Sequence, residues 1–356
     1  MPDYGNMHGW HGDEFVERPD FDLPAYMGAT TFAKLPLVTD IEQVADLAPD
    51  AVIVGAPLDD GTTYRPGARF GPRAIRTGNN NYGSFYSLQL GVDLFEVLDV
   101  IDAGDANIEP VWLERGYAMI YRKVRDLAGT GAVPIVLGGD HGITWPAASA
   151  VAEVNHPARI GMVHFDAHAD TGEVTGPIAN HGAPMRKLLE SGAIAGPNFV
   201  QVGLRGYWPD GETLAWMKEK GFRSHFITEI EEDGAEAVVD RAIDEALDGA
   251  DAVYLSVDID VLDPAHAPGT GTAEPGGMST RELLRAVRRI AGAVELAGMD
   301  VVEVSPPFDH ADLTSMAANR VVMEALSALA VKKRSGTGVR RTVGQAVRDE
   351  RTPGKT

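Results

Sequence analysis

Ionisable side chains alternate along the stretch VHFDAHAD, residues 163–170. Asp166, His168 and Asp170 occupy every second position directly after an apolar run that we expect to be buried. Alternate side chains of an extended segment point to the same side, so a strand that continues into its loop could direct all three at one point. Carboxylate oxygens and imidazole nitrogens gathered in this way are a reasonable start for a metal site, but three residues alone do not establish one.

Two further segments place residues of the same kinds after apolar runs. His141 follows one run in LGGDHG, and SVDIDVLDP repeats the alternation with Asp258 and Asp260. Each fragment alone is weak evidence, because Asp and His are common in loops at strand ends. Together the three fragments supply two histidines and four aspartates, a set that suits a pair of divalent cations. Two cations about 3.5–4 Å apart can share a water, lower its pKa and deliver hydroxide to an electrophilic carbon.

Short β-branched runs must position these residues. The runs are almost continuously apolar, which is typical of strands in a sheet that is covered on both faces. They span residues 51–57, 133–141, 159–166, 198–204, 251–260 and 297–306.

Helical patterns lie between these runs. Apolar residues recur at spacings of three and four within residues 113–127 and 238–246. Ser279 and Glu282 form the pattern of a capping box, which predicts the start of another helix. The alternation of strands and helices predicts a three-layer α/β/α sandwich with a mostly parallel central sheet and ligands at the carboxyl ends of the strands.

Composition limits the class of protein and its partners. The chain has 356 residues, no cysteine and a net charge of −21. Without cysteine there is no disulfide, thiolate zinc site or cysteine nucleophile, so any metal must be held by nitrogen and oxygen ligands. The negative charge disfavours nucleic acid, whose phosphates would be repelled. No apolar run reaches the about 18 residues of a membrane span and no secretory signal is evident, so we expect a cytoplasmic protein without a membrane partner.

One catalytic domain with an addition at each end is the expected organisation. Residues 41–330 carry the alternating pattern, without a repeat or a long linker. Residues 1–40 contain several prolines and no clear period, so we interpret them as an extended arm whose histidines do not bind metal. Residues 331–356 have a local excess of six positive charges, which we interpret as a solvated or subunit-contacting tail rather than a nucleic-acid arm.

The combination of motifs resembles the ureohydrolases, the arginase and agmatinase family. GGDH, DAHAD and SVDIDVLDPAHAPGTGTAEPGG are similar to three signatures of this family, and YRPGARFGPRAIR, residues 64–76, resembles its agmatinase-like branch. The resemblance covers roughly residues 30–330. It implies an arginase-like fold with two divalent metal ions, manganese or in some relatives nickel, and hydrolysis of a guanidino group to urea and an amine by a metal-bridging hydroxide. The metal ligands that it implies are His141, Asp166, His168, Asp170, Asp258 and Asp260.

Two further residues take catalytic and substrate-binding roles from the same resemblance. His181 in ANHGAPMR stands where the family has a mobile histidine that shuttles protons to the departing amine, a role that suits a side chain titrating near neutrality. A loop histidine that only binds substrate or water is the alternative. Glu303 in VVEVSPP stands where the family has a carboxylate that pairs with the guanidinium through two parallel hydrogen bonds. Asp140 is expected to orient the neighbouring ligand, and Asp263 to form a turn.

The chain departs from the family pattern on the substrate side. Gly142 stands where a hydroxyl residue is usual, Ala183 where a threonine is usual and Ala273 where a proline is usual, so we expect a pocket wall with fewer polar groups. The loop 171–180 is poor in large or basic side chains, which makes L-arginine the less favoured substrate. Agmatine, guanidinobutyrate, guanidinopropionate and compact guanidines such as guanidine, guanylurea or a biguanide remain open.

Two other functions are less favoured. A deacetylase-type amide hydrolase with a single zinc would not need the carboxylates for a second metal. A non-catalytic subunit that supports an active paralogue in a mixed oligomer would not need the complete ligand set. We therefore expect an enzyme for a small cationic guanidino substrate, assembled as a homo-oligomer, either a trimer or a hexamer. Manganese and nickel both accept these ligands.

Overall fold

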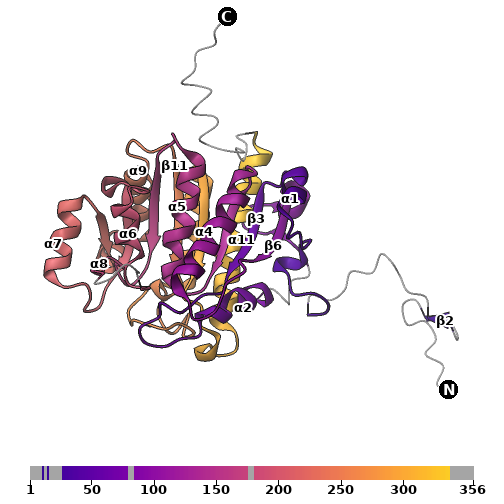
Figure 1. The fold of residues 1–356 in the computed structure, drawn as a ribbon, viewed down its shortest axis with the longest axis horizontal. Helices are drawn as coiled ribbons and strands as arrows, with labels where there is room; N and C mark the ends of the chain where they lie inside the picture. Colours follow the sequence, from indigo (N-terminus) through magenta and orange to yellow (C-terminus); the bar gives the residue numbers. More distant parts are fainter. Residues whose placement is uncertain (1–9, 12–13, 16–25, 79–83, 175–179, 337–356) are drawn as a thin grey trace, which may run out of the picture.

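The computed structural model describes residues 26–78, 84–174 and 180–336 together with the short segments 10–11 and 14–15 (Figure 1). Most of the predicted N-terminal arm and residues 337–356 of the predicted tail lie outside the described residues. The two short segments, β1 (Trp10–His11) and β2 (Glu14–Phe15), pair antiparallel. No helix among the described residues is long and apolar enough to cross a membrane.

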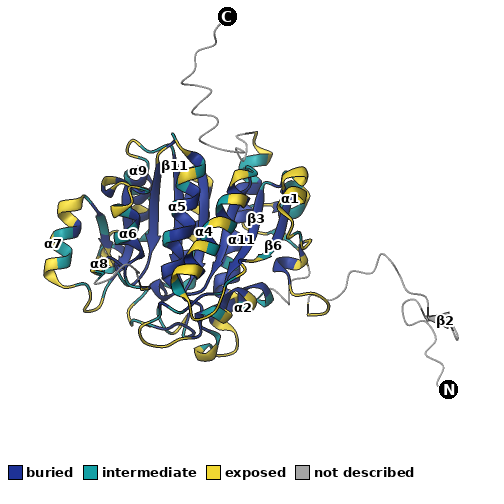
Figure 2. Ribbon diagram, viewed as in Figure 1, coloured by how far each residue is buried: buried dark blue, intermediate teal, exposed yellow. Residues whose placement is uncertain are grey.

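An eight-stranded sheet forms the centre, in the order β10-β9-β8-β11-β12-β7-β3-β6, and all of its strand pairs are parallel. Its inner strands are buried along their whole length, as their continuous apolar runs require (Figure 2). The strands are β3 (Ala51–Ala56), β6 (Val100–Asp105), β7 (Val133–Gly138), β8 (Ile160–Phe165), β9 (Phe199–Leu204), β10 (Arg223–Phe226), β11 (Ala252–Asp258) and β12 (Leu296–Val302).

Helices cover both faces of this sheet, which confirms the predicted three-layer sandwich. On one side α4 packs against α5, and on the other α10 packs against both α9 and α11. The helices are α1 (Ile41–Leu47), α2 (Gly71–Thr77), α3 (Leu94–Val97), α4 (Leu113–Gly129), α5 (Thr144–Asn155), α6 (Pro184–Glu190), α7 (Gly211–Lys220), α8 (Ile227–Asp233), α9 (Ala235–Ala246), α10 (Thr280–Ala293) and α11 (Leu313–Arg334).

The predicted capping box begins α10. The backbone N–H of Glu282 donates to Ser279 Oγ, and the backbone N–H of Ser279 donates to Glu282 Oε2 at 2.8 Å. These reciprocal bonds satisfy two backbone donors that the helix itself cannot satisfy. The helix α11 continues through Arg334. The first residues of the predicted C-terminal tail, which begins at residue 331, are therefore helical.

A buried ion pair fixes the edge strand β6, which the sequence analysis did not identify. Asp102 interrupts the apolar run of this strand, and its carboxylate accepts two hydrogen bonds from Arg76 of α2, at 2.8 and 2.9 Å. Asp102 is completely buried and Arg76 is nearly so. A charged residue is therefore accommodated in a strand only because a second element brings its partner.

Candidate metal centre and substrate cavity

The predicted metal ligands lie at the carboxyl ends of three strands, β7, β8 and β11, and Glu303 follows a fourth strand, β12. The order β8-β11-β12-β7 brings together strands that lie far apart in the sequence. Because these strands are parallel, their carboxyl ends meet at one edge of the sheet. A short 3₁₀ turn follows two of them, η3 (His141–Ile143) after β7 and η5 (Ile259–Val261) after β11. Each turn begins with an aspartate that accepts a backbone N–H, so the chain leaves the strand in a fixed direction.

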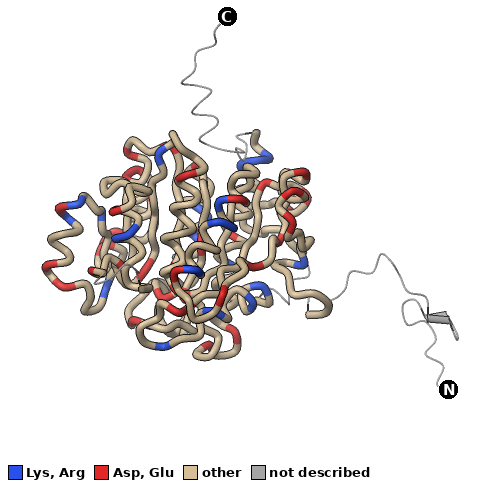
Figure 3. Tube along the Cα trace, viewed as in Figure 1, with Lys and Arg blue, Asp and Glu red and all other residues tan. Residues whose placement is uncertain are grey.

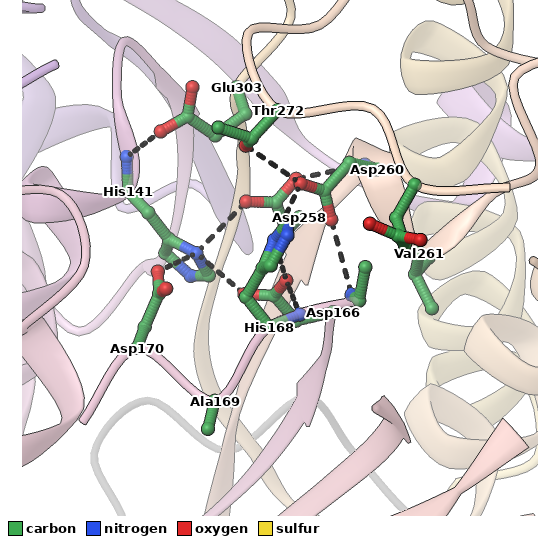
Figure 4. Close-up of polar contacts among 12 residues, drawn as sticks. His141, Asp166, His168, Ala169, Asp170, Asp258, Asp260, Val261, Thr272 and Glu303 are labelled. Carbon is green, nitrogen blue, oxygen red and sulfur yellow. Dashed lines mark hydrogen bonds and ion pairs between the residues drawn. The ribbon is translucent and has the colours of Figure 1, made fainter. Parts of the chain in front are cut away.

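A first cluster of ligand atoms surrounds the ring of His141. Its Nδ1 lies 3.1 Å from Asp166 Oδ2, 3.0 Å from Asp170 Oδ2 and 3.0 Å from Asp258 Oδ2 (Figure 4). This Nδ1 is buried and none of the three contacts has hydrogen-bond geometry, so the nitrogen has no hydrogen-bond partner. A buried nitrogen lone pair that faces three carboxylates fits a bound cation.

A second cluster adjoins the first through Asp166. His168 Nδ1 lies 3.4 Å from Asp166 Oδ1 and 3.1 Å from Asp260 Oδ2. Asp166 thus turns one carboxylate oxygen toward each cluster, and the ligand atoms within each cluster lie within 4.8 Å of one another. The structure therefore brings all six predicted ligand residues together in two adjoining sets, which fits two cations that share a carboxylate.

The electrostatics of these residues also favour bound cations. Burial, followed by the nearby carboxylates of Asp260 and Asp166, raises the pKa of Asp258 well above its usual range. Burial likewise raises the pKa of Asp260. Several buried carboxylates thus lie close together, and divalent cations would offset their mutual repulsion.

Three polar residues that the sequence analysis missed hold the ligands in place. His164 donates to Asp166 Oδ2 at 2.8 Å, because its Nδ1 accepts from the Gln201 amide at 3.1 Å. His141 Nε2 lies 3.0 Å from Ser256 Oγ, and that hydroxyl donates to Asp300 Oδ1 at 2.7 Å. Such contacts fix the tautomer of a ligand histidine and the orientation of its ring. The missed residues are His164, Ser256 and Asp300.

Glu303 lies directly beside the clusters, in a left-handed backbone conformation with a φ of 62°. Its Oε1 accepts hydrogen bonds from the backbone N–H of His141 at 2.8 Å and from His181 Nδ1 at 2.9 Å. Its Oε2 is buried and has no hydrogen-bond partner. A non-glycine residue in this conformation costs free energy, and such residues concentrate at functional sites.

His181 is buried against Glu303. Burial lowers the pKa of His181, but the hydrogen bond and charge of Glu303 outweigh burial and, with Asp170 and Asp140, raise this pKa to about 9. The backbone N–H of Thr63 donates to His181 Nε2 at 3.1 Å. Both predicted catalytic residues therefore lie together, at a hydrogen-bond distance.

A cavity of about 470 Å³ opens over these residues. None of its described lining residues is Lys or Arg, whereas Glu173 and Trp208 are present. A larger hollow of about 810 Å³ lies between α9 and α10, but it contains none of the predicted site residues, so it is not the reaction site. The cavity is lined by Thr63, His168, Asp170, Gly172, Glu173, Asn180, His181, Gly182, Trp208, Asp258, Thr272 and Glu303.

Gly142, which was expected to leave the pocket wall with fewer polar groups, does not line the described cavity. A Cβ at this position would lie 2.1 Å from the hydroxyl oxygen of Tyr117 on α4, so the tyrosine fills the space that a side chain would take. Gly142, Ala183 and Ala273 are all absent from the described lining of the cavity. Asp140 accepts the backbone N–H groups of Gly61 and Gly142, so it holds the loops around the site.

Comparison with known proteins agrees with this site. The model of the Arginase family matches residues 49–328. Proclavaminate amidinohydrolase from Streptomyces clavuligerus is 37% identical over 313 residues, which cover 87% of this chain and 96% of that protein. Guanidinopropionase from Pseudomonas aeruginosa is 38% identical over 314 residues, which cover 87% of this chain and 94% of that protein.

Solved structures show the same likeness. The structure of the Streptomyces clavuligerus proclavaminate amidinohydrolase has a TM-score of 0.80 at 36% identity and covers 86% of this chain and 99% of that one. A variant of formiminoglutamase from Trypanosoma cruzi, solved with Mn²⁺, has a TM-score of 0.74 at 25% identity and covers 80% of this chain and 94% of that one.

Proposed function

The chain belongs to the arginase family, and we propose that it hydrolyses a guanidino compound whose far end is cationic or neutral rather than anionic. The reaction class is that of a metal-dependent guanidino hydrolase, which splits a C–N bond to give urea and an amine. The observation that carries the proposal is the free Glu303 Oε2, a buried carboxylate oxygen beside both ligand clusters. An oxygen of this kind calls for a cationic donor from the substrate.

Two divalent ions are proposed as the cofactor. His141, Asp166, Asp170 and Asp258 would hold one ion, and Asp166, His168 and Asp260 would hold the other. Cations in such a pair lower the pKa of a bound water and make it a nucleophile toward the guanidino carbon. Carboxylate-rich ligand sets suit manganese, which is also the metal in the Trypanosoma cruzi structure. We propose manganese as the native metal, with nickel as the alternative.

Glu303 is proposed to receive the guanidinium through one oxygen. Two parallel hydrogen bonds, the expectation from the sequence, would need both carboxylate oxygens. Oε1 already accepts from His141 and His181, so only Oε2 is free for the substrate. The bond to Oε2 holds the guanidino carbon over the ligand clusters, and such fixed placement can remove several kcal/mol of the barrier, about 7–11 in well-oriented systems.

The far end of the substrate meets a wall without cations. The loop 171–180 contains no Lys or Arg in its sequence, and none lines the described cavity. Glu173 and Trp208 supply a carboxylate and an aromatic face, which both attract a cation. Acidic residues are also distributed over the helices and loops of the body (Figure 3). A substrate carboxylate, as in guanidinobutyrate or guanidinopropionate, would lose hydration without gaining a cationic partner from the described lining.

A matched pair of substrates tests this proposal. Agmatine and guanidinobutyrate share a four-carbon chain and differ in the charge of the far end. Metal-free protein is reloaded with manganese or with nickel, and urea release is measured over a panel that also includes guanidine, guanylurea and a biguanide. We expect kcat/KM for agmatine or a compact guanidine to exceed that for guanidinobutyrate by at least about tenfold, which corresponds to about 1.4 kcal/mol. Preference for guanidinobutyrate would refute the charge argument, and absence of urea from every compound would refute the function.

The alternative functions are not favoured by these observations. A single-zinc amide hydrolase would leave the second ligand cluster and the free Glu303 oxygen without a role. A cytoplasmic location, a trimeric or hexameric state and independence from a paralogous subunit remain predictions. Light scattering and urea release of the purified chain test the last two.

A further inference from the structure

The loop that follows β3 holds His181 at two points. The backbone N–H of His181 donates to the carbonyl of Gly61 at 3.1 Å. The backbone N–H of Thr63 donates to His181 Nε2 at 3.1 Å, and Thr63 Oγ1 lies 2.7 Å from the same nitrogen. The loop is itself anchored, because the Gly61 N–H donates to Asp140 Oδ2 at 2.9 Å. Thr63 is thus fixed against the ring nitrogen that faces away from Glu303.

These contacts determine which nitrogen of the neutral ring carries the proton. A backbone N–H can only donate, so Nε2 must accept from Thr63 and cannot carry a proton in this geometry. The ring proton then lies on Nδ1 and is donated to Glu303 Oε1 at 2.9 Å. The Thr63 hydroxyl also donates to Nε2 in this state. Within the described residues Nε2 has no other hydrogen-bond partner than Thr63.

Protonation of the ring reverses the role of the hydroxyl. An imidazolium carries a proton on both nitrogens, and the proton on Nε2 is repelled by the fixed N–H of Thr63. The hydroxyl can rotate and accept this proton, which the backbone cannot do. The hydrogen of the hydroxyl then points away from Nε2. Because Thr63 lines the substrate cavity, this hydrogen can be donated to a group that is bound there. The Thr63 hydroxyl therefore connects His181 Nε2 with the space where the leaving group departs.

We propose that Thr63 is a proton-relay residue that carries the proton from His181 Nε2 to the departing amine. In the step, the C–N bond breaks and its electron pair leaves with the amine nitrogen. That nitrogen takes the proton of Thr63 Oγ1, while Oγ1 takes the proton of His181 Nε2. As the C–N bond breaks, a lone pair of the oxygen added by the attacking water forms the C=O bond of urea. The products are urea, the neutral amine, an intact threonine and a neutral imidazole whose Nε2 again accepts from Thr63. This inference rests on the proposed hydrolysis of a guanidino compound.

The test compares three substitutions in one loop. Thr63→Val keeps the shape but removes the hydroxyl, and Thr63→Ser keeps the hydroxyl. Thr62→Val is the matched control, because Thr62 Oγ1 is buried without a hydrogen-bond partner and so makes no hydrogen bond to His181. We expect Thr63→Val to lower kcat by about 10²-fold or more, the effect of losing a positioned proton donor, with KM and metal content unchanged. Thr63→Ser should keep kcat within a few-fold of the wild type, and Thr62→Val should keep it unchanged.

Solvent isotope measurements separate a relay from a structural role. Two protons move together in the relay. A plot of kcat against the deuterium fraction of the solvent should therefore be curved for the wild type and for Thr63→Ser. The same plot should be linear for Thr63→Val. Equal kcat in Thr63→Val and the wild type, or equal losses in Thr63→Val and Thr63→Ser, would overturn the relay. A wild type that releases no urea would instead refute the proposed function.

The tautomer gives a readout that does not depend on activity. In metal-free protein with ¹⁵N-labelled histidine, at a pH above the pKa of His181, we expect the His181 proton on Nδ1. His181→Asn identifies the signal by its loss. A proton found on Nε2 would contradict the contact with Thr63 and, with it, the relay.

Discussion

Replacing Asp258 by asparagine should stabilise the metal-free protein and remove most of the stabilisation that metal binding gives. Burial and the neighbouring carboxylates of Asp260 and Asp166 raise the pKa of Asp258 well above its value in an unfolded chain. When the pKa of a carboxyl group is higher in the folded than in the unfolded protein, the group lowers the free energy of unfolding at any pH above its unfolded pKa. This loss of stability grows as the pH rises toward the folded pKa. The metal-free wild type therefore carries this cost at neutral pH, and it loses the cost below a pH of about 4.

The expected magnitudes follow from this shift and from metal binding. A raised folded pKa means that the charged carboxylate costs stability at neutral pH, so Asp258→Asn, which carries no charge, should stabilise the metal-free protein there. In the presence of metal at about 100 times its dissociation constant, binding stabilises the wild type by about 2.7 kcal/mol. A ligand lost from the first cluster should weaken binding by about 100-fold or more, which leaves about 0.4 kcal/mol. Asp258→Asn should therefore lose about 2.3 kcal/mol of the stabilisation that metal gives the wild type.

Thermal melts with chelator and with added manganese measure both states, and elemental analysis counts the metal. Asp263→Asn is the control, because Asp263 accepts backbone N–H groups of Ala265 and Gly276 in a turn of the same loop. These bonds lower the pKa of Asp263, so its replacement should destabilise the metal-free protein and leave the metal content unchanged. A metal-free Asp258→Asn protein less stable than the wild type, or one that keeps two metals per chain, would refute the reasoning.

Three further substitutions test other parts of the structure. Glu303→Gln should lower turnover by at least about 10²-fold with both metals retained, because the guanidino carbon is no longer held in place; unchanged urea release across the panel would contradict this role. His181→Ala should lower turnover by about 10²–10⁴-fold, with partial rescue by added imidazole and unchanged metal content, whereas wild-type turnover would assign proton transfer to another group. Arg76→Leu should destabilise the protein by about 3–5 kcal/mol in denaturant titrations, because it leaves Asp102 charged and buried. The exposed Arg73→Leu should change stability by less than about 0.5 kcal/mol, and a similar loss in both variants would argue against the buried pair.

The predicted strands and helices depended on continuous or periodic apolar runs, and those predictions were confirmed for the inner part of the sheet. The edge strands β6 and β10 were missed for different reasons. Asp102 breaks the apolar run of β6, and only the fold shows that Arg76 neutralises it. Strand β10, Arg223–Phe226, is short and partly exposed, so its sequence does not differ from that of a loop. The local pattern of apolar residues thus fails to predict a strand such as β6, whose charged residue is neutralised by a side chain from another element.

The same distinction applies within the site. The clustering of the proposed ligand residues could be predicted because they lie at the ends of recognisable strands. The contact between Thr63 and His181 joins residues 118 positions apart in loops without a pattern, so no local feature of the sequence indicates it. The free oxygen of Glu303 is likewise visible only once the partners of its other oxygen are known.

The alternation that predicts the metal ligands also contains residues that contact them. His164 lies two positions before Asp166 in β8, and Ser256 lies two positions before Asp258 in β11. Side chains two positions apart in a strand share one face, so the earlier residue lies beneath the later one and can reach the site. His164 contacts Asp166 directly, whereas Ser256 of β11 contacts His141, which follows β7, two strands away in the sheet. A buried polar group without a hydrogen-bond partner would destabilise the sheet. A polar residue that lies two positions before a proposed ligand, inside an otherwise apolar strand, therefore indicates a hydrogen bond that positions the ligand set.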